Sequence, residues 1–342
     1  MTRSAEPVSN PRGAHVAREF KHERPLLRCA FDPSGTFLFC AGEESPIQRF
    51  HVETQEKITL QGHVSWVNGF AFPGDGQTMV SGACDGRLAW WPLEDKDRHE
   101  PLEIIQAHDG WIRSIALSPD RQLVASAGND EKVRVWSGTE RKLVQEFPGH
   151  KTHVYSVAFH PTKQHLVSAD HRGVIKQWDL ESGELVRELD ASPLYTFNQG
   201  YRAAAGGVRT MDFSPDGRWL VGCGLTDATD TFGQRVRPAV VSIDWDSGER
   251  KAVLRGQRDE FGVCWGVKFH ASNRFLAAVS GGRSAKHIYF WRPDQVKPIH
   301  AVVLPSAARD LTLHPDGRHL ATAHYDGIAR LIDLVPAENK TS

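Results

Sequence analysis

The sequence lacks the features that mark several large classes of protein. It contains no run of about 18 apolar residues, so we expect no membrane-spanning helix. Its N-terminal segment has no apolar core of the kind found in a secretory signal peptide. The formal net charge is only −1, which gives no strong field toward nucleic acid or an anionic membrane. We therefore expect neither a nucleic-acid partner nor a membrane partner.

Cysteine pairs and catalytic motifs are also missing. The five cysteines are scattered, with no Cys-x-x-Cys spacing, which predicts reduced thiols and a cytoplasmic location rather than a disulfide framework or a zinc site. The chain has no Gly-x-Ser-x-Gly, no phosphate-binding glycine-rich loop before a helix, no His-Glu-x-x-His and no EF-hand loop. We predict no catalytic residue, no bound metal and no cofactor.

The sequence does contain one short pattern that is repeated seven times. A strand-like stretch ends in Phe or Leu and continues into a polar turn, as in "CAFDPSG" and "MDFSPDG". The residues that end these stretches, which we call anchors, are Phe31, Phe72, Leu117, Phe159, Phe213, Phe269 and Leu313. Successive anchors lie 41 to 56 residues apart, near the repeat length of a four-stranded propeller blade. Alternating apolar residues after each turn favour strands, and no helix of useful length is visible.

The repeats predict an all-β fold, namely a seven-bladed β-propeller of four-stranded antiparallel blades. The last unit stops after "ARLIDLV" without an outer strand, and the N-terminal "AHVAREFKH" has the pattern of the missing strand. We expect residues about 14–20 to pair with the third strand of the last blade, because closing the ring removes exposed sheet edges. The predicted organisation is a polar N-terminal tail at 1–13, the propeller at 14–335 and a C-terminal tail at 336–342.

Paired residues at the blade boundaries add a family resemblance. With the pair Gly62-His63 before one unit and the pair Trp178-Asp179 at the end of another, the chain resembles the WD-repeat family of β-propellers over residues 15–333. The resemblance implies a buried hydrogen-bond network of His, Ser, Asp and Trp within a blade. Two units match it in full, with His63, Ser81, Asp85 and Trp91 in one and His108, Ser126, Asp130 and Trp136 in the other. We expect these eight residues to be structural, because buried polar atoms are tolerated only when they are paired.

The later units depart from this pattern. Unit four has Arg172 where the Asp is expected, although Asp170 is close by. Unit five has Ile243 in place of the Trp, and unit six has Trp291 but neither the His nor the Asp. Two explanations stay open at this point: ordinary divergence of degenerate repeats, or adaptation of blades four to six to a ligand.

Three segments are longer than their counterparts in the other units. Residues 191–207 precede unit five, and residues 225–238 and 281–287 separate the second and third strands of units five and six. In a propeller these two kinds of loop open on one face, so we expect all three to project from one rim. Loops on a rigid scaffold often carry binding residues. The loop candidates for partner contact are Tyr201, Phe232 and Arg235.

The innermost strands begin on the same face, around the mouth of the central channel. Aligning the units on their anchors brings Arg, Trp and Tyr side chains to this mouth. The candidate partner-binding residues there are Trp66, Trp111, Arg113, Tyr155, Arg209, Trp265 and Arg309. Trp, Tyr and Arg dominate interface energetics, and the Arg fork suits carboxylates, phosphates and acidic peptides. The alternative is that many of these side chains only fill space between blades.

These observations predict a non-catalytic protein–protein interaction scaffold or peptide-binding module that is monomeric on its own. It would use the channel mouth and the enlarged loops of blades five and six, and its partners would be proteins or peptides, acidic segments among them. The family resemblance implies this function, since a fold alone does not specify one. The alternative is a propeller-type hydrolase or lactonase with a metal in the channel, which would need His, Asp, Glu or Asn side chains converging from several innermost strands.

Overall fold

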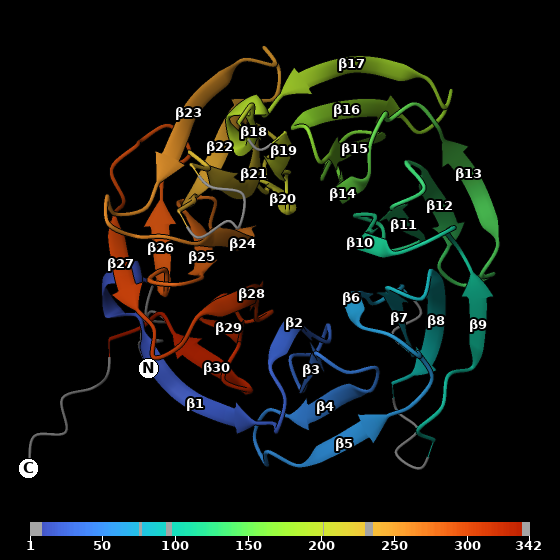
Figure 1. The fold of residues 1–342 in the computed structure, drawn as a ribbon. Helices are drawn as coiled ribbons and strands as arrows, with labels where there is room; N and C mark the ends of the chain where they lie inside the picture. Colours follow the sequence, from blue (N-terminus) through green and yellow to red (C-terminus); the bar gives the residue numbers. More distant parts are fainter. Residues whose placement is uncertain (1–8, 75–76, 94–97, 201, 230–234, 337–342) are drawn as a thin grey trace, which may run out of the picture.

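The computed structural model describes residues 9–74, 77–93, 98–200, 202–229 and 235–336, which form a ring of seven sheets around a central axis (Figure 1). Each of the seven sheets has four antiparallel strands. In six sheets the strands lie side by side in chain order, and in the seventh the N-terminal strand takes the outermost place. The predicted seven-bladed propeller is therefore confirmed. The described residues also contain two short 3-10 turns, η1 (Pro11–Gly13) and η2 (Ser192–Leu194), and no helix among them could cross a membrane.

The blades are numbered from the first complete sheet, and the innermost strand of each is named first. Blade one contains β2 (Leu26–Phe31), β3 (Phe37–Gly42), β4 (Ile47–His51) and β5 (Lys57–Leu60). Blade two contains β6 (Val67–Ala71), β7 (Thr78–Ala83), β8 (Arg87–Pro92) and β9 (Glu103–Gln106). Blade three contains β10 (Ile112–Leu117), β11 (Leu123–Gly128), β12 (Val133–Ser137) and β13 (Leu143–Phe147).

The remaining blades follow the same plan. Blade four contains β14 (Val154–Phe159), β15 (His165–Asp170), β16 (Val174–Asp179) and β17 (Leu185–Asp190). Blade five contains β20 (Thr210–Phe213), β21 (Trp219–Thr226), β22 (Arg237–Asp244) and β23 (Arg250–Arg255). Blade six contains β24 (Val263–Phe269), β25 (Leu276–Gly281), β26 (His287–Trp291) and β27 (His300–Val303). Blade seven contains β28 (Ala308–Leu313), β29 (His319–His324), β30 (Ile328–Asp333) and, on the outside, β1 (His15–Lys21).

The two ends of the described chain close the ring in blade seven. β1 pairs antiparallel with β30, with Phe20 opposite Ala329, so the predicted closure by the N-terminal strand is confirmed. Phe20 is almost fully buried, and its ring lies 5.6 Å from that of Phe50 in blade one. The buried Arg330 donates to Glu19 of β1 at 3.0 Å, which adds a polar link across the same junction.

The residues just before β1 also contact blade seven. Ser9 Oγ donates to the carbonyl of Gly317 at 2.6 Å, and the Asn10 amide donates to the carbonyl of Leu334 at 2.8 Å. The part of the predicted N-terminal tail at residues 9–13 therefore packs on the propeller. Residues 1–8 and 337–342, the remainder of the predicted tails, lie outside the described residues.

The core lies between neighbouring blades. One cluster joins Phe39 and Ile47 of blade one to Phe72, Met79 and Trp91 of blade two, all buried. The second strand of a blade is covered on both faces, which explains its nearly continuous small and apolar sequences such as "TMVSGA". Apolar burial between sheets is thus what holds the ring together.

Anchor-turn histidines add polar links between blades. The Nε2 atoms of three of them hydrogen-bond to a glycine carbonyl in the matching turn of the next blade. The three pairs are His160 with Gly217 (3.2 Å), His270 with Gly317 (2.7 Å) and His314 with Gly35 (3.0 Å). At Gly35 φ is +74°, and an added Cβ would come within 2.2 Å of the His314 ring, so the turn requires glycine there.

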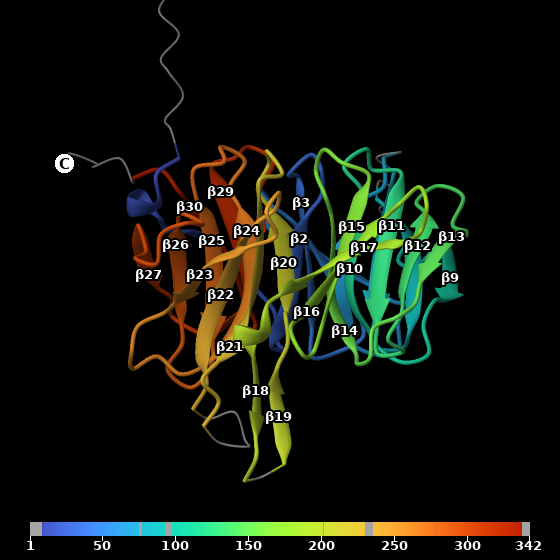
Figure 2. The ribbon, with the colours of Figure 1, turned by 90° about the horizontal axis from the view of Figure 1, so that it is seen from above.

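The enlarged loops project from one face of the ring, as predicted. β18 (Tyr195–Asn198) and β19 (Ala203–Gly206) pair as a two-stranded hairpin that extends beyond the sheets (Figure 2). We call this side of the ring the hairpin face. Leu225 and Val236, at the base of the blade-five loop, pack in a small cluster with Ala205 of the hairpin and Val263 of blade six. The hairpin and the blade-five loop therefore share one packed base with the start of blade six.

Candidate partner-binding site at the channel mouth

A β-bulge at the start of the innermost strand positions the side chains at the channel mouth. In six blades the pairing between the first two strands skips one residue, four positions before the anchor. The skipped residues are Leu27, Asn68, Arg113, Tyr155, Trp265 and Arg309. In blade five the same position is Arg209, which lies just before β20 and whose amide donates to the Cys223 carbonyl at 2.7 Å. A bulge re-aims a side chain, and here it does so at the same level all around the channel.

These side chains line one pocket of about 170 Å³ at the mouth. All seven mouth residues predicted from the sequence line it: Trp66, Trp111, Arg113, Tyr155, Arg209, Trp265 and Arg309. Leu27, Arg28, Asn68 and Cys84 complete the lining. The channel mouth, as used below, means this set of residues. Trp66 and Trp111 are each 42% exposed, so they form an apolar lip rather than part of the interblade core.

Guanidinium groups and aromatic rings alternate around the mouth. The Arg113 guanidinium lies 4.6 Å from the centre of the Trp111 ring and 4.9 Å from that of Tyr155. Arg209 lies 4.7 Å from Tyr155 and 5.3 Å from Trp265. The Arg309 guanidinium lies over the Trp265 ring, 3.9 Å from its centre. Each arginine is thereby held by cation–π contacts and presents its fork in a fixed place.

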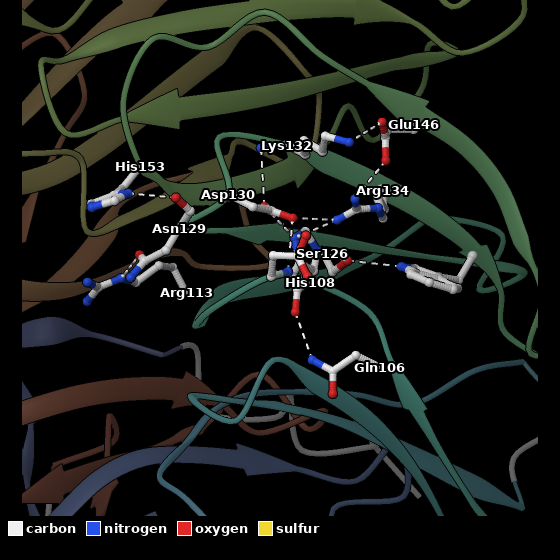
Figure 3. A network of polar contacts seen from close by, with 12 residues as sticks. Gln106, His108, Arg113, Ser126, Asn129, Asp130, Lys132, Arg134, Glu146 and His153 are labelled. Atoms are coloured by element: carbon white, nitrogen blue, oxygen red, sulfur yellow. Dashed lines mark hydrogen bonds and ion pairs between the residues drawn. The ribbon is translucent and has the colours of Figure 1, made fainter.

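A hydrogen bond from the neighbouring turn orients Arg113. Its Nε donates to Asn129 Oδ1 at 2.7 Å, and the carbonyl of Asn129 is 2.7 Å from His153 Nδ1 (Figure 3). Asn129 adjoins Asp130, a member of the buried network of blade three. The rigid network therefore supports one side of the mouth. His153 contacts the turn and does not line the pocket.

The arginines perturb one another because little negative charge balances them. Burial, together with the charge of Arg28, lowers the pKa of Arg309 to about 10. Burial and the same Arg28 charge also lower the pKa values of Arg113 and Arg209. Among the described residues no carboxylate forms an ion pair with any of these four arginines. The guanidinium groups stay charged at neutral pH, so the mouth is a partly desolvated cluster of positive charge.

Arg28 is the mouth residue that the sequence did not reveal. It lies three rather than four positions before its anchor, where the other innermost strands have Gly, Ser, Thr or Asp. Its Nε donates to the Asn68 carbonyl at 2.9 Å and its Nη1 to the Leu27 and Arg309 carbonyls, which turns the side chain across the channel. No sequence pattern signals this, because the orientation depends on carbonyl groups in three blades.

Of the three loop residues predicted to contact a partner, one lies among the described residues. Tyr201 and Phe232 lie outside the described residues. Arg235 is exposed beside the blade-five loop, where its carbonyl accepts from Thr229, and it does not line the mouth. On the hairpin itself Phe197 is exposed, so an aromatic side chain does extend the rim above blades four and five.

The two predicted structural networks are present. In blade two, His63 bonds to Asp85 (3.1 Å) and Ser81 (2.8 Å), and Trp91 Nε1 donates to Ser81 (2.7 Å). In blade three, His108 bonds to Asp130 (2.8 Å) and Ser126 (2.7 Å), and Trp136 donates to Ser126 (2.9 Å). Burial would raise the pKa of Asp130, but hydrogen bonds from His108 and Arg134 hold it well below the usual range.

Blade four contains a complete network, although its sequence departs from the pattern. Asp170, at the end of β15, supplies the carboxylate of the network, although the repeat pattern has Arg172 at the position where the Asp is expected. It lies 3.3 Å from His150, which bonds to Ser168 at 2.7 Å, and Trp178 donates to Ser168 at 2.8 Å. The carboxylate comes two residues earlier along the chain but reaches the same imidazole.

Blade six replaces the network rather than losing it. Glu260, almost fully buried, receives hydrogen bonds from Ser280 (2.5 Å), His287 (3.1 Å) and Tyr289. Burial would raise the pKa of Glu260, yet these bonds together lower it. Trp291 Nε1 is buried without a partner among the described residues. Glu260 lies nine residues before its anchor Phe269, the position that His63, His108 and His150 hold in blades two to four. The repeat marks this position, but the change from histidine to glutamate hid its role in a network.

A group of potential metal ligands lies far from the mouth. The ligand atoms of His314, Asp316 and His319 lie within 4.8 Å of one another in the anchor turn of blade seven, on the face opposite the hairpin. His314 Nε2 already bonds to the Gly35 carbonyl, and its Nδ1 accepts from the Asp316 amide at 3.2 Å. This group is therefore part of the turn that joins blade seven to blade one.

Comparison with known families agrees with this architecture. The family model for the WD domain, G-beta repeat (WD40) matches residues 54–91, 99–137, 141–179, 191–229 and 300–333, more than half of the chain. The protein belongs to the WD40 family. The matches at 54–91, 99–137 and 141–179 each run from the outer strand of one blade through three strands of the next, so the WD40 repeat bridges neighbouring blades. No curated protein gives a significant match.

Proposed function

We propose that this WD40 propeller is a non-catalytic interaction module that binds a segment of a partner protein at the channel mouth. WD40 propellers commonly mediate protein–protein interactions. The observation that carries the proposal is the convergence of four arginines, two exposed tryptophans and two further aromatic rings on one pocket. These are the residue types that supply most interface energy, and they are held rigid before binding.

The hairpin and the loops of blades five and six extend this surface. They rise from the same face as the mouth, and the exposed Phe197 lies on the hairpin (Figure 2). A partner segment seated in the mouth would run along this rim, which favours protein or peptide partners over small molecules.

The monomeric state and the cytoplasmic location belong to the same proposal. The latter is supported by five buried cysteines that form no disulfide.

The alternative of a channel-sited metal hydrolase has no comparable support. The side chains that converge at the mouth are mainly Arg, Trp and Tyr, which are poor ligands for a divalent cation. Stoichiometric metal in the purified protein, together with turnover in a broad hydrolase screen, would favour the enzyme instead.

Affinity capture with mouth variants tests the proposal. The double variant Arg209→Ala/Arg309→Ala is expected to lose most of the partner protein captured by the wild type, because truncating hot-spot arginines costs about 2 kcal/mol or more each. Its melting temperature should change little, since neither arginine is ion-paired with a carboxylate among the described residues. Arg274→Ala, at an exposed arginine on the opposite face, is the matched control. Undiminished capture by the double variant would refute the channel-mouth site.

A further inference from the structure

The channel mouth has more positive charge than the protein itself balances. Arg28, Arg113, Arg209 and Arg309 face one pocket of about 170 Å³. Two carboxylates interact electrostatically with these arginines: the charge of Glu43 acts on Arg309, and Arg28 and Asp310 act on each other. Burial raises the pKa of Asp310, and its carboxylate already accepts from the Cys29 amide at 3.1 Å. Neither carboxylate forms an ion pair with an arginine, so the mouth favours an anionic ligand.

The donors at the mouth are fixed in place and incompletely used. Arg209 Nε is buried and has no hydrogen-bond partner among the described residues. Arg113 uses its Nε for the bond to Asn129, and no described residue accepts a hydrogen bond from either of its Nη atoms. Arg309 stacks on Trp265 at 3.9 Å, and no described residue accepts a hydrogen bond from its guanidinium. An unsatisfied buried donor is costly, so these groups favour a ligand rich in acceptor oxygens.

We propose that the mouth binds a phosphorylated serine or threonine side chain of the partner segment. This inference rests on the proposed function and names the chemistry of its ligand. A carboxylate carries one charge and two oxygens, whereas a phosphate monoester carries between one and two charges at neutral pH and three strong acceptor oxygens. Several guanidinium forks can therefore share one phosphoryl group, and charge-assisted bidentate bonds of this kind are the strong ones.

The shape of the site agrees with a peptide-borne phosphate. The pocket has several times the space of one water molecule, about 30 Å³ in the liquid, so it holds a phosphoryl group with its ester oxygen. The exposed rings of Trp66 and Trp111 stand beside it and offer apolar contact to the residues that flank the modified side chain. A free anion would use the arginines but would leave this lip uncovered.

A peptide array tests the inference directly. The same set of diverse peptides is printed with a central threonine, a central glutamate and a central phosphothreonine, and is probed with the purified full chain. We expect at least tenfold stronger binding to the phosphorylated version. Arg209→Lys and Arg309→Lys should each reduce that binding at least tenfold, because lysine keeps the charge but not the fork. Arg274→Lys, on the opposite face, should leave it unchanged, and melting temperatures report whether each variant folds.

The other outcomes separate this inference from the proposed function. Equal binding to the glutamate or unmodified peptides, lost in the arginine variants, would overturn phosphate recognition while leaving the interaction module intact. Stabilisation by inorganic phosphate or phenyl phosphate with no binding to any peptide would overturn the peptide source. Unchanged partner capture by Arg209→Ala/Arg309→Ala would remove the site itself, and both proposals with it.

Discussion

The buried His324 of blade seven should make the stability of the ring depend on pH. His324 is fully buried, with Nδ1 3.0 Å from the Ser306 carbonyl and Nε2 2.7 Å from Thr322 Oγ1. Burial, helped by the nearby charge of Arg330, lowers the pKa of His324 to about 4, while the charge of Asp326 opposes this shift. The imidazole is therefore neutral in the folded protein throughout the physiological range.

The sign and size of the effect follow from linkage. An unfolded histidine has a pKa of about 6.5, so between that pH and about 4 the unfolded chain binds a proton that folded His324 does not. Stability contributed by the neutral imidazole is therefore lost as pH falls through this window, and the loss levels off below it. Between pH 7 and pH 5 this residue alone accounts for about 2 kcal/mol.

Urea unfolding followed by tryptophan fluorescence at pH 7 and pH 5 measures this loss. His324→Asn retains a donor for the Ser306 carbonyl but cannot titrate, so its loss of stability between the two pH values should be about 2 kcal/mol smaller than that of the wild type. His15→Asn, at a half-buried histidine of β1, controls for the removal of one histidine. If His324→Asn and the wild type lose the same stability, the reasoning is refuted. NMR titration of the wild-type imidazole gives an independent answer should the variant not fold.

Three further predictions concern the core and the networks. Phe20→Ala should destabilise the protein by about 3 to 5 kcal/mol in urea unfolding, because it empties the junction that closes the ring. Ser126→Ala leaves an imidazole and an indole N–H unpaired, and at about 1 to 3 kcal/mol for each group it should cost far more than Ser182→Ala at an exposed turn. Trp291→Phe should cost about 1 to 2 kcal/mol less than Trp136→Phe, since the indole N–H of Trp291 has no partner to lose among the described residues. Comparable losses for the two tryptophan variants would contradict that last assignment.

The ring and most of its mouth could be predicted from the sequence because they depend on local, repeated signals. The anchors mark where each innermost strand ends, and counting back four residues locates Arg113, Tyr155, Arg209, Trp265 and Arg309. The closure by β1 followed from one missing strand and one unassigned strand. Each of these steps needed only spacing and alternation.

What the sequence could not show depends on contacts between segments. The bulge that turns the mouth residues into the channel involves pairing to a second strand, and the orientation of Arg28 depends on carbonyl groups in three blades. Asp170 reaches its network from a position that the repeat pattern does not mark, and Glu260 is a carboxylate at the position where the other networks have a histidine. The hairpin β18–β19 was visible only as extra length, because its short strands carry little alternation.

Site-specific photo-crosslinking tests the central claim, that the partner binds at the channel mouth. A photoreactive phenylalanine analogue placed at Trp111, on the lip of the mouth, should crosslink to the captured partner, and Arg209→Ala/Arg309→Ala in the same chain should abolish the crosslink. The analogue at Arg274, on the opposite face, should give none. Crosslinks from Arg274 with none from Trp111 would show that the partner uses the other face, and would contradict the account.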